Sequence, residues 1–195
     1  MEDFTLSKCE GLDLRLRDEQ ADIEFIVATK FLTKRALKIN AITKTFTPLW
    51  RLKKGFKVKR EGDHVVLFTF DDKSEMEKIL STKPWSFDKH LMVLQSFDKE
   101  IDLTEMEFNK VTFWVQVHDI PIQFQNRKVA EQICGAIGIV NETVDEIEIE
   151  GDSFIRTRVT IDISKPLSCG CVISLENGKE LWVSFKYERL PNICY

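Results

Sequence analysis

The sequence predicts an α+β protein of two small domains, each a sandwich of helices packed on a β-sheet. Segments with the two-residue period of a strand alternate with segments of helical period in both halves of the chain, which favours packed α/β layers over a bundle or a barrel. An acidic stretch with no apolar period separates the two halves. The 195 residues suffice for this arrangement, because independent domains begin at about 50 residues.

The first half begins with a predicted strand and a predicted helix. Residues 23–32 are rich in β-branched and aromatic side chains, as is typical of a strand. Thr33 is a candidate helix N-cap, and the apolar residues after it recur at spacings of three and four. Pro48 is expected to end this helix, because a proline cannot donate a backbone hydrogen bond.

Two further strands, a second helix and a last strand complete the first half. Residues 50–60 alternate basic and apolar side chains, and after a turn residues 64–70 form a compact apolar strand. Ser74 is the expected N-cap of the second helix, and Glu77 would complete a capping box. Residues 91–97 are the closing strand, so the expected element order is βαββαβ.

The second half partly repeats this pattern and adds an extended antiparallel hairpin. Asn126 is the expected N-cap of a helix that Gly138 ends. Asn177 and Gly178 stand between two alternating runs, which is a strong signal for a hairpin turn. Further strands are predicted over residues 111–118, 139–149 and 155–163.

Changes in composition mark the expected domain boundaries. Residues 98–110 contain five acidic residues and no apolar period, so we place a linker within them. The expected organisation is an acidic N-terminal segment (1–22), a first domain (23–100), a linker (101–110), a second domain (111–193) and two final residues (194–195).

The charge of the chain is unevenly distributed. Its formal net charge is -4, yet the segment from Lys30 to Arg60, the basic block, contains eleven lysines and arginines and no acidic residue. Such a block creates a positive local field that attracts polyanions whatever the net charge. The sequence therefore predicts a phosphate-binding surface, although a solvated basic face of helix and hairpin would produce the same pattern.

A nucleic acid is the polyanion that this surface is expected to bind. The affinity would fall as salt rises, with little sequence selectivity. Trp50 and Phe56 stand among the cations and are candidates for stacking on bases, unless they are core residues. The cations of the basic block are expected to gather into one exposed trough, which two arginines on one face of the strand 155–163 would extend. The expected contact residues are Lys34, Arg35, Lys38, Trp50, Arg51, Lys53, Lys54, Phe56, Lys57, Lys59, Arg60, Arg156 and Arg158.

Other classes of protein are less consistent with the sequence. The common catalytic motifs are absent, so we expect no enzymatic activity and no cofactor. Five cysteines are an odd number, and a reduced compartment without structural disulfides is expected. Cys169 and Cys171 alone are a weak metal signal.

No stretch approaches the roughly 18 apolar residues of a membrane helix, and the acidic N-terminus does not resemble a signal peptide. We therefore expect an intracellular protein, nuclear or cytoplasmic, with no membrane partner.

Several segments together resemble a known plant family. These are residues 25–99 and the motifs VTFWVQVHDIP, FIRTRVTIDISKPL and YERLPNICY. They resemble the plant domain of unknown function 4283, which occurs in the first open reading frame of LINE-type retrotransposons and in proteins derived from them. The resemblance implies nucleic-acid binding, with single-stranded RNA as the expected ligand.

The resemblance also carries an expectation about metal. In that family a CCHC zinc knuckle follows a motif like YERLPNICY, so Cys194 is the candidate first ligand of a knuckle. Because the chain ends at Tyr195, we expect it to be truncated before the knuckle and to bind no metal.

The first half further resembles an RNA-recognition motif in its element order. Such a sheet stacks bases on aromatic side chains that point outward. Alternation along the strand 64–70, however, places Val65 and Leu67 on one face and Phe68 and Phe70 on the other. An aliphatic face of this kind predicts packing against another segment or subunit. The alternative function is therefore protein–protein interaction or self-association through this face.

Overall fold

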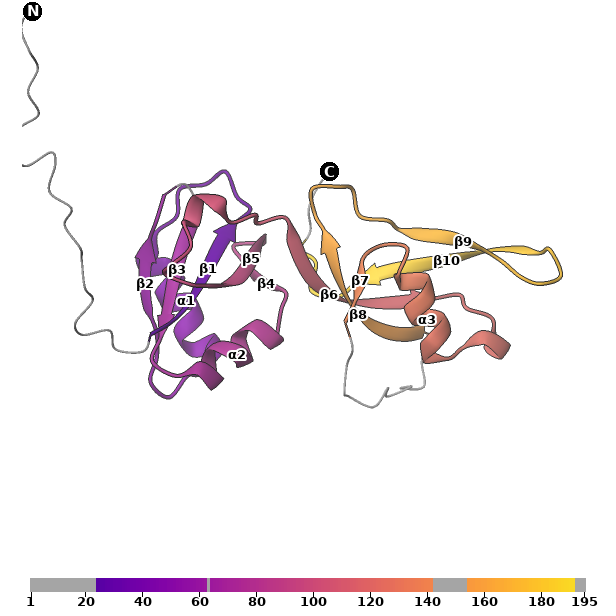
Figure 1. Cartoon of the computed structure of the whole chain (residues 1–195), viewed down its shortest axis with the longest axis horizontal. Helices are drawn as coiled ribbons and strands as arrows, with labels where there is room; N and C mark the ends of the chain where they lie inside the picture. Colours follow the sequence, from indigo (N-terminus) through magenta and orange to yellow (C-terminus); the bar gives the residue numbers. More distant parts are fainter. Residues whose placement is uncertain (1–23, 63, 142–153, 192–195) are drawn as a thin grey trace, which may run out of the picture.

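Two lobes make up the protein. The structure is a computed structural model that describes residues 24–62, 64–141 and 154–191. In these residues the chain is α+β, with two five-stranded antiparallel sheets and three α-helices. Figure 1 shows the two lobes side by side, joined by residues 98–109.

The first lobe contains one sheet with two helices on one of its faces. The strands are ordered β2-β3-β1-β5-β4, and the short strand β4, which the sequence analysis did not predict, forms a hairpin with β5. The elements are β1 (Phe25–Phe31), α1 (Ile39–Trp50), β2 (Lys57–Arg60), β3 (Val65–Phe70), α2 (Lys73–Ser81), β4 (Trp85–Phe87) and β5 (His90–Phe97).

Helix α1 begins and ends later than the sequence predicted. Thr33 is not its N-cap, because the helix begins only at Ile39. Pro48 lies inside the last turn rather than ending the helix, which continues to Trp50. Phe46 and Trp50 are buried on one face of α1, and their burial against the sheet stabilises the last turn despite the hydrogen bond that a proline cannot donate.

Helix α2 has a different N-cap from the predicted one. The Asp72 carboxylate accepts hydrogen bonds from the backbone nitrogen and the hydroxyl of Ser74, at 2.8 and 2.7 Å, which lower the pKa of Asp72. Glu77 forms an ion pair with Lys73 at 3.7 Å. The predicted capping box of Ser74 and Glu77 is therefore wrong, because the helix begins at Lys73 and this places Asp72 at the N-cap.

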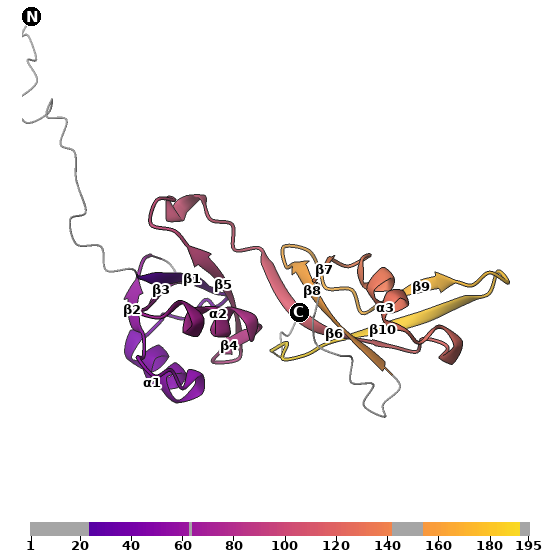
Figure 2. The same cartoon turned by 60° about the horizontal axis from the view of Figure 1, so that its bottom comes forward.

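The other face of the first sheet, which we call the outer face, is covered by the chain itself. Ile26, Ala28 and Leu67 form a buried cluster there, and Leu103, Met106 and Phe108 of the connecting segment pack against it. The side chain of Gln95 donates a hydrogen bond of 2.7 Å to the carbonyl oxygen of Glu107. Figure 2 shows this segment, with the short 3-10 helix Leu103–Glu105, on the side of the sheet opposite α1 and α2. The segment predicted as a linker therefore forms part of the packing of the first lobe.

The second lobe has a sheet ordered β7-β8-β6-β10-β9, with one helix on one face. Asn126 caps this helix as predicted, since its side chain accepts a hydrogen bond of 3.0 Å from the backbone nitrogen of Val129. The helix ends at Cys134, before Gly138. The elements are β6 (Lys110–His118), a 3-10 helix (Ile122–Phe124), α3 (Arg127–Cys134), β7 (Ile139–Val140), β8 (Phe154–Asp162), β9 (Gly170–Ser174) and β10 (Glu180–Tyr187).

The predicted hairpin is confirmed, and it extends away from the first lobe (Figure 1). Strands β9 and β10 pair across a turn in which Gly178 has a φ of 77°, a conformation that suits glycine. The strand predicted over 139–149 is described only in part, as β7, and the rest of it lies largely outside the described residues.

Apolar side chains join the two lobes. Leu91 and Val93 of β5 belong to the same buried cluster as Phe113 and Val115 of the second lobe, and Phe108 packs on the clusters of both lobes. None of the described helices is long and apolar enough to cross a membrane.

Candidate nucleic-acid interface

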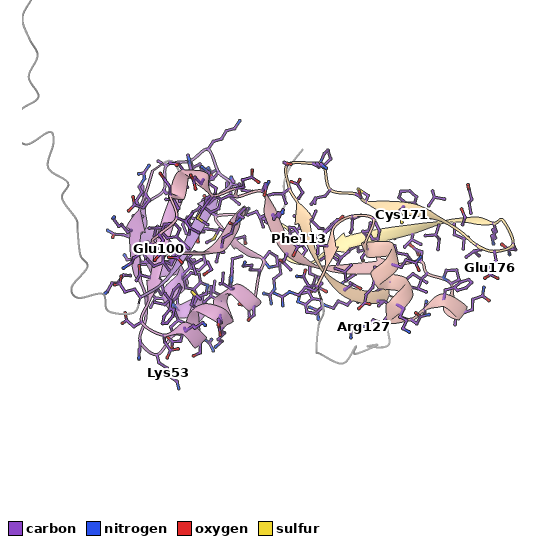
Figure 3. The ribbon with its side chains drawn as sticks, viewed as in Figure 1. Lys53, Glu100, Phe113, Arg127, Cys171 and Glu176 are labelled. Carbon is purple, nitrogen blue, oxygen red and sulfur yellow. The ribbon has the colours of Figure 1, made fainter. Side chains whose placement is uncertain are left out.

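The basic block is divided between two ends of the first lobe. The chain passes along β1 in one direction and returns along α1, so Lys34, Arg35 and Lys38 precede α1 while Arg51 and Lys53 follow it. A helix of 12 residues separates the two groups by about 18 Å. In Figure 3, Lys53 lies at the lower end of this lobe. The expectation that the block gathers into one trough is therefore wrong.

Some of these cations are already neutralised by carboxylates. Arg35 forms an ion pair with Asp88 at 2.8 Å, Lys57 with Glu24 at 3.4 Å, and Lys59 with Glu61. Hydrogen bonds from Lys99 and Lys57 lower the pKa of Glu24. The guanidinium of Arg60 donates a hydrogen bond of 3.3 Å to the carbonyl oxygen of Gly62. Six cations of the predicted set in the basic block form no ion pair with a described carboxylate: Lys34, Lys38, Arg51, Lys53, Lys54 and Arg60.

The two aromatic residues proposed to stack on bases belong to the core. Trp50 is only 3% exposed, and its ring lies 4.9 Å from that of Phe68 and 5.0 Å from that of Phe56. Phe56 is half-buried and packs on the same cluster. Trp50 has no exposed ring face for a base in this fold, so its predicted stacking role is wrong, and the alternative of a core residue holds for both side chains.

The two arginines predicted in the second half surround a tryptophan. Pairing of β6 with β8 places Trp114 directly opposite Arg158 and Gln116 opposite Arg156. The guanidinium carbon of Arg156 lies 4.4 Å from the centre of the Trp114 ring, and that of Arg158 lies 5.9 Å away. Arg156 also forms an ion pair with Glu188 at 2.6 Å. The arrangement places two cations on an aromatic ring, where cation–π attraction holds them in position.

These residues belong to the face of the second sheet that α3 does not cover, which we call the open face. His118 and Phe154 lie opposite each other on it, with ring centres 4.9 Å apart. The register of β10 with β6 places Ser184 and Lys186 on the same face. Trp182, two residues before Ser184 in the same strand, lies on this face as well, because side chains alternate between the two faces of a sheet. The open face includes Trp114, Gln116, His118, Phe154, Arg156, Arg158, Trp182, Ser184 and Lys186.

Trp182 is the most accessible aromatic side chain of the open face. It is 56% exposed, and one side of its indole ring lies against Gly170 of the neighbouring strand. A Cβ at position 170 would lie 2.5 Å from that ring and closer still to the carbonyl oxygen of Val183, so only glycine fits there. The tryptophan is thus held against the sheet by a backbone contact while more than half of its surface remains in contact with solvent.

The comparisons with known proteins indicate the class of a nucleic-acid-binding-like domain. Residues 161–195 match the family described as zinc knuckle, and zinc knuckles are among the modules that recognise RNA. Residues 20–105 match the family described as "Domain of unknown function (DUF4283)", which confirms the resemblance over that part of the chain. A stretch of 121 residues, 62% of this chain, is 25% identical to an uncharacterized protein of Arabidopsis thaliana, At4g02000, and spans 38% of that protein's length.

The zinc-knuckle match corrects one expectation. We expected the chain to be truncated before its knuckle, but the match extends over residues 161–195. It includes the last two residues of β8, all of β9 and β10, and the candidate ligand Cys194, which lies outside the described residues.

The residues within this match do not fit the ligand set of a zinc knuckle. The segment 161–195 contains three cysteines, Cys169, Cys171 and Cys194, and no histidine, whereas three cysteines and one histidine are needed. Cys171 packs on the core of the second lobe, and burial raises its pKa, which disfavours the thiolate that binds zinc. Among the described residues no group of three metal-binding side chains converges.

Removal of metal is accordingly expected to leave the second lobe folded. After dialysis against EDTA the melting temperature should equal that of the untreated protein, because the sheet is stabilised by its apolar core rather than by a zinc ion. Differential scanning fluorimetry and elemental analysis of the same samples check this. One zinc ion per chain together with a lower melting temperature after EDTA would contradict it.

Proposed function

We propose that this chain is a non-enzymatic protein that binds single-stranded nucleic acid, with RNA as the preferred ligand. The observation that carries the proposal is the open face of the second sheet, where Trp114 and Trp182 lie among Arg156, Arg158 and Lys186. Single strands bind to surfaces that combine aromatic rings for the bases with cations for the phosphates. The open face supplies both groups on one sheet.

Each group on this face has a distinct role in the proposal. Trp182 offers a ring that is fixed against Gly170 and accessible to a base. The guanidinium of Arg156 lies over Trp114, so a second base can stack on the planar guanidinium. Lys186 stands beside Gln116 in the neighbouring strand and supplies a charge for the backbone. The amide of Gln116 donates a hydrogen bond of 3.1 Å to Glu188, the carboxylate that also forms the ion pair with Arg156.

The first lobe supports the same proposal in a different way. Its element order, together with the neighbouring strands β2-β3-β1-β5, favours an RNA-recognition-motif-like topology of the split βαβ type. Its outer face is covered by Leu103, Met106 and Phe108. In the proposal the bases therefore bind to the second lobe. Origin from a LINE-type retrotransposon, which the family resemblance implies, is part of the proposal.

The test is fluorescence anisotropy of labelled oligo-uridine RNA and of the matching DNA, at low and at moderate salt. Trp182→Ala is expected to weaken binding on the order of tenfold, since one stacked base contributes about 1–3 kcal/mol. Ile122→Ala is the matched control, because Ile122 is 88% exposed and lies in the 3-10 helix before α3 rather than on the sheet. The RNA affinity should fall steeply as salt rises.

A double substitution in the first lobe compares the contributions of the two lobes to RNA binding. Lys53→Glu combined with Lys54→Glu reverses charges at one end of the first lobe, where neither lysine has an ion-pair partner among the described residues. This pair should weaken binding less than Trp182→Ala does. No binding by the unmodified chain at low salt, or equal binding by Trp182→Ala and Ile122→Ala, would refute the proposal.

A further inference from the structure

Two arginines of the second lobe bind the end of a helix in the first lobe. Arg158 donates a hydrogen bond of 2.5 Å to the carbonyl oxygen of Ser81, and Arg189 donates one of 3.4 Å to that of Thr82. Ser81 is the last residue of α2 and Thr82 is its C-cap. Carbonyl groups at a helix C-terminus carry partial negative charge and attract cations, which explains why two guanidinium groups meet there.

Lys83 adds a third cation at the same place. It follows Thr82 in the chain, is half-buried, and forms no ion pair with a carboxylate of the described residues. Burial, with a smaller contribution from the charge of Arg158, lowers the pKa of Lys83 to about 8. The site therefore holds more positive charge than the helix terminus neutralises.

A hollow opens beside this cluster, between the two lobes. It has a volume of about 620 Å³, and Lys89 and Arg189 line it together with the apolar residues Leu49, Trp85 and Leu190. No carboxylate from the described part of the chain lines it. Pro84, the residue after Lys83, also lines it. We call this space the junction hollow.

The residues that line the junction hollow suit one kind of ligand. On one side are Lys89 and Arg189, which form no ion pair with a carboxylate of the described residues, and on the other is an indole ring; together they suit a phosphate joined to a flat, partly apolar group. Trp85 is held in place because its ring nitrogen donates a hydrogen bond of 3.0 Å to the carbonyl oxygen of Ile79. A bound phosphate would offset the repulsion among Lys83, Arg158 and Arg189, because opposite charges stabilise the charged form of each group.

We propose that the junction hollow binds a nucleotide unit, with its phosphate at Lys89 and Arg189, which line the hollow, next to the cluster that contains Lys83, and its base beside Trp85. The proposal rests on the proposed function in that the nucleotide would belong to the strand that crosses the open face. Arg158 contacts both Ser81 of the first lobe and Trp114 of the open face. A single nucleic-acid strand could therefore pass from the junction hollow to the open face. Binding there would link both lobes to the same ligand.

The experiment uses the full chain with selectively 13C-labelled lysines and NMR titration of the Lys83 side chain. The probes are uridine 5′-monophosphate and inorganic phosphate, each added alone. Uridine 5′-monophosphate should raise the pKa of Lys83 above about 8 and should bind more tightly than inorganic phosphate, because only the nucleotide reaches Trp85. Lys89→Gln should weaken nucleotide binding several-fold, whereas Lys128→Gln, which changes an exposed lysine of α3 that does not line the hollow, should leave it unchanged.

The outcomes separate this proposal from the proposed function. If oligo-uridine binds the protein but neither probe changes the Lys83 resonance, the junction hollow is not a nucleotide site and only this inference fails. If the nucleotide binds and Lys89→Gln weakens it while oligo-uridine does not bind, the inference stands and the proposed function fails. Equal binding by Lys89→Gln and the unmodified chain would also overturn the inference.

Discussion

Trp50→Ala is expected to destabilise the first lobe by about 3–5 kcal/mol, which is the usual cost of removing a large aromatic side chain from a core. The indole ring contacts five other aromatic rings, those of Phe46, Phe56, Phe68, Phe70 and Trp85, at centre distances of 4.7–6.0 Å. Alanine would leave a cavity among all of them. Since domains are stable by only about 5–15 kcal/mol, a large fraction of the chains should lose the fold of this lobe. Urea unfolding followed by circular dichroism measures the effect.

The neighbouring residue provides the control. Leu49 precedes Trp50 in α1 but is 51% exposed, so Leu49→Ala should change the unfolding free energy by less than about 0.5 kcal/mol. Trp50→Phe should retain more stability than Trp50→Ala, because it keeps a ring in the cavity. If Trp50→Ala left stability unchanged and only weakened binding to nucleic acid, the indole would be a stacking residue after all, and the core described above would be incorrect.

The sequence predicted best those elements that depend on nearby residues. The strand expected over 111–118 is β6, and the side chain of Asn126 caps α3 as expected. The bounds of α1 could not be derived in this way. The position of Trp50 depends on contacts with β3 and β4, which are remote in sequence, and these contacts extend the helix past Pro48.

The candidate site was harder to predict than the fold. The cations of the basic block are contiguous in sequence, but a strand followed by a helix carries the chain from one end of the lobe to the other, so contiguity does not place them together. Arg156 and Arg158 were predicted from their strand face alone. Trp114 was visible on the polar side of its strand, but its position beside the arginines depends on the pairing of β6 with β8. No short-range pattern in a single sequence indicates which residues of these two strands pair.

Leu67→Asp is the second substitution with a large expected effect, and it tests the alternative function. If the aliphatic face of the first sheet were a surface for self-association, a charge there would change the oligomeric state of an otherwise stable protein. In the structure Leu67 is 9% exposed and is covered by Leu103, Met106 and Phe108 of the same chain. The substitution should therefore act on stability, at a cost of several kcal/mol for an unpaired buried charge.

Val65→Asp is the matched variant, because Val65 is on the same face, two residues away, but only half-buried and outside that cluster. It is paired with Lys30 of β1, so an aspartate there gains a cation as its cross-strand neighbour, and its effect on stability should be much smaller. Thermal unfolding and sedimentation velocity on both variants separate the possibilities. A lower melting temperature for Leu67→Asp with unchanged sedimentation supports intramolecular covering of the outer face. An unchanged melting temperature with a shift in sedimentation would show instead that connecting residues 98–109 leave this face free and that a second copy occupies it.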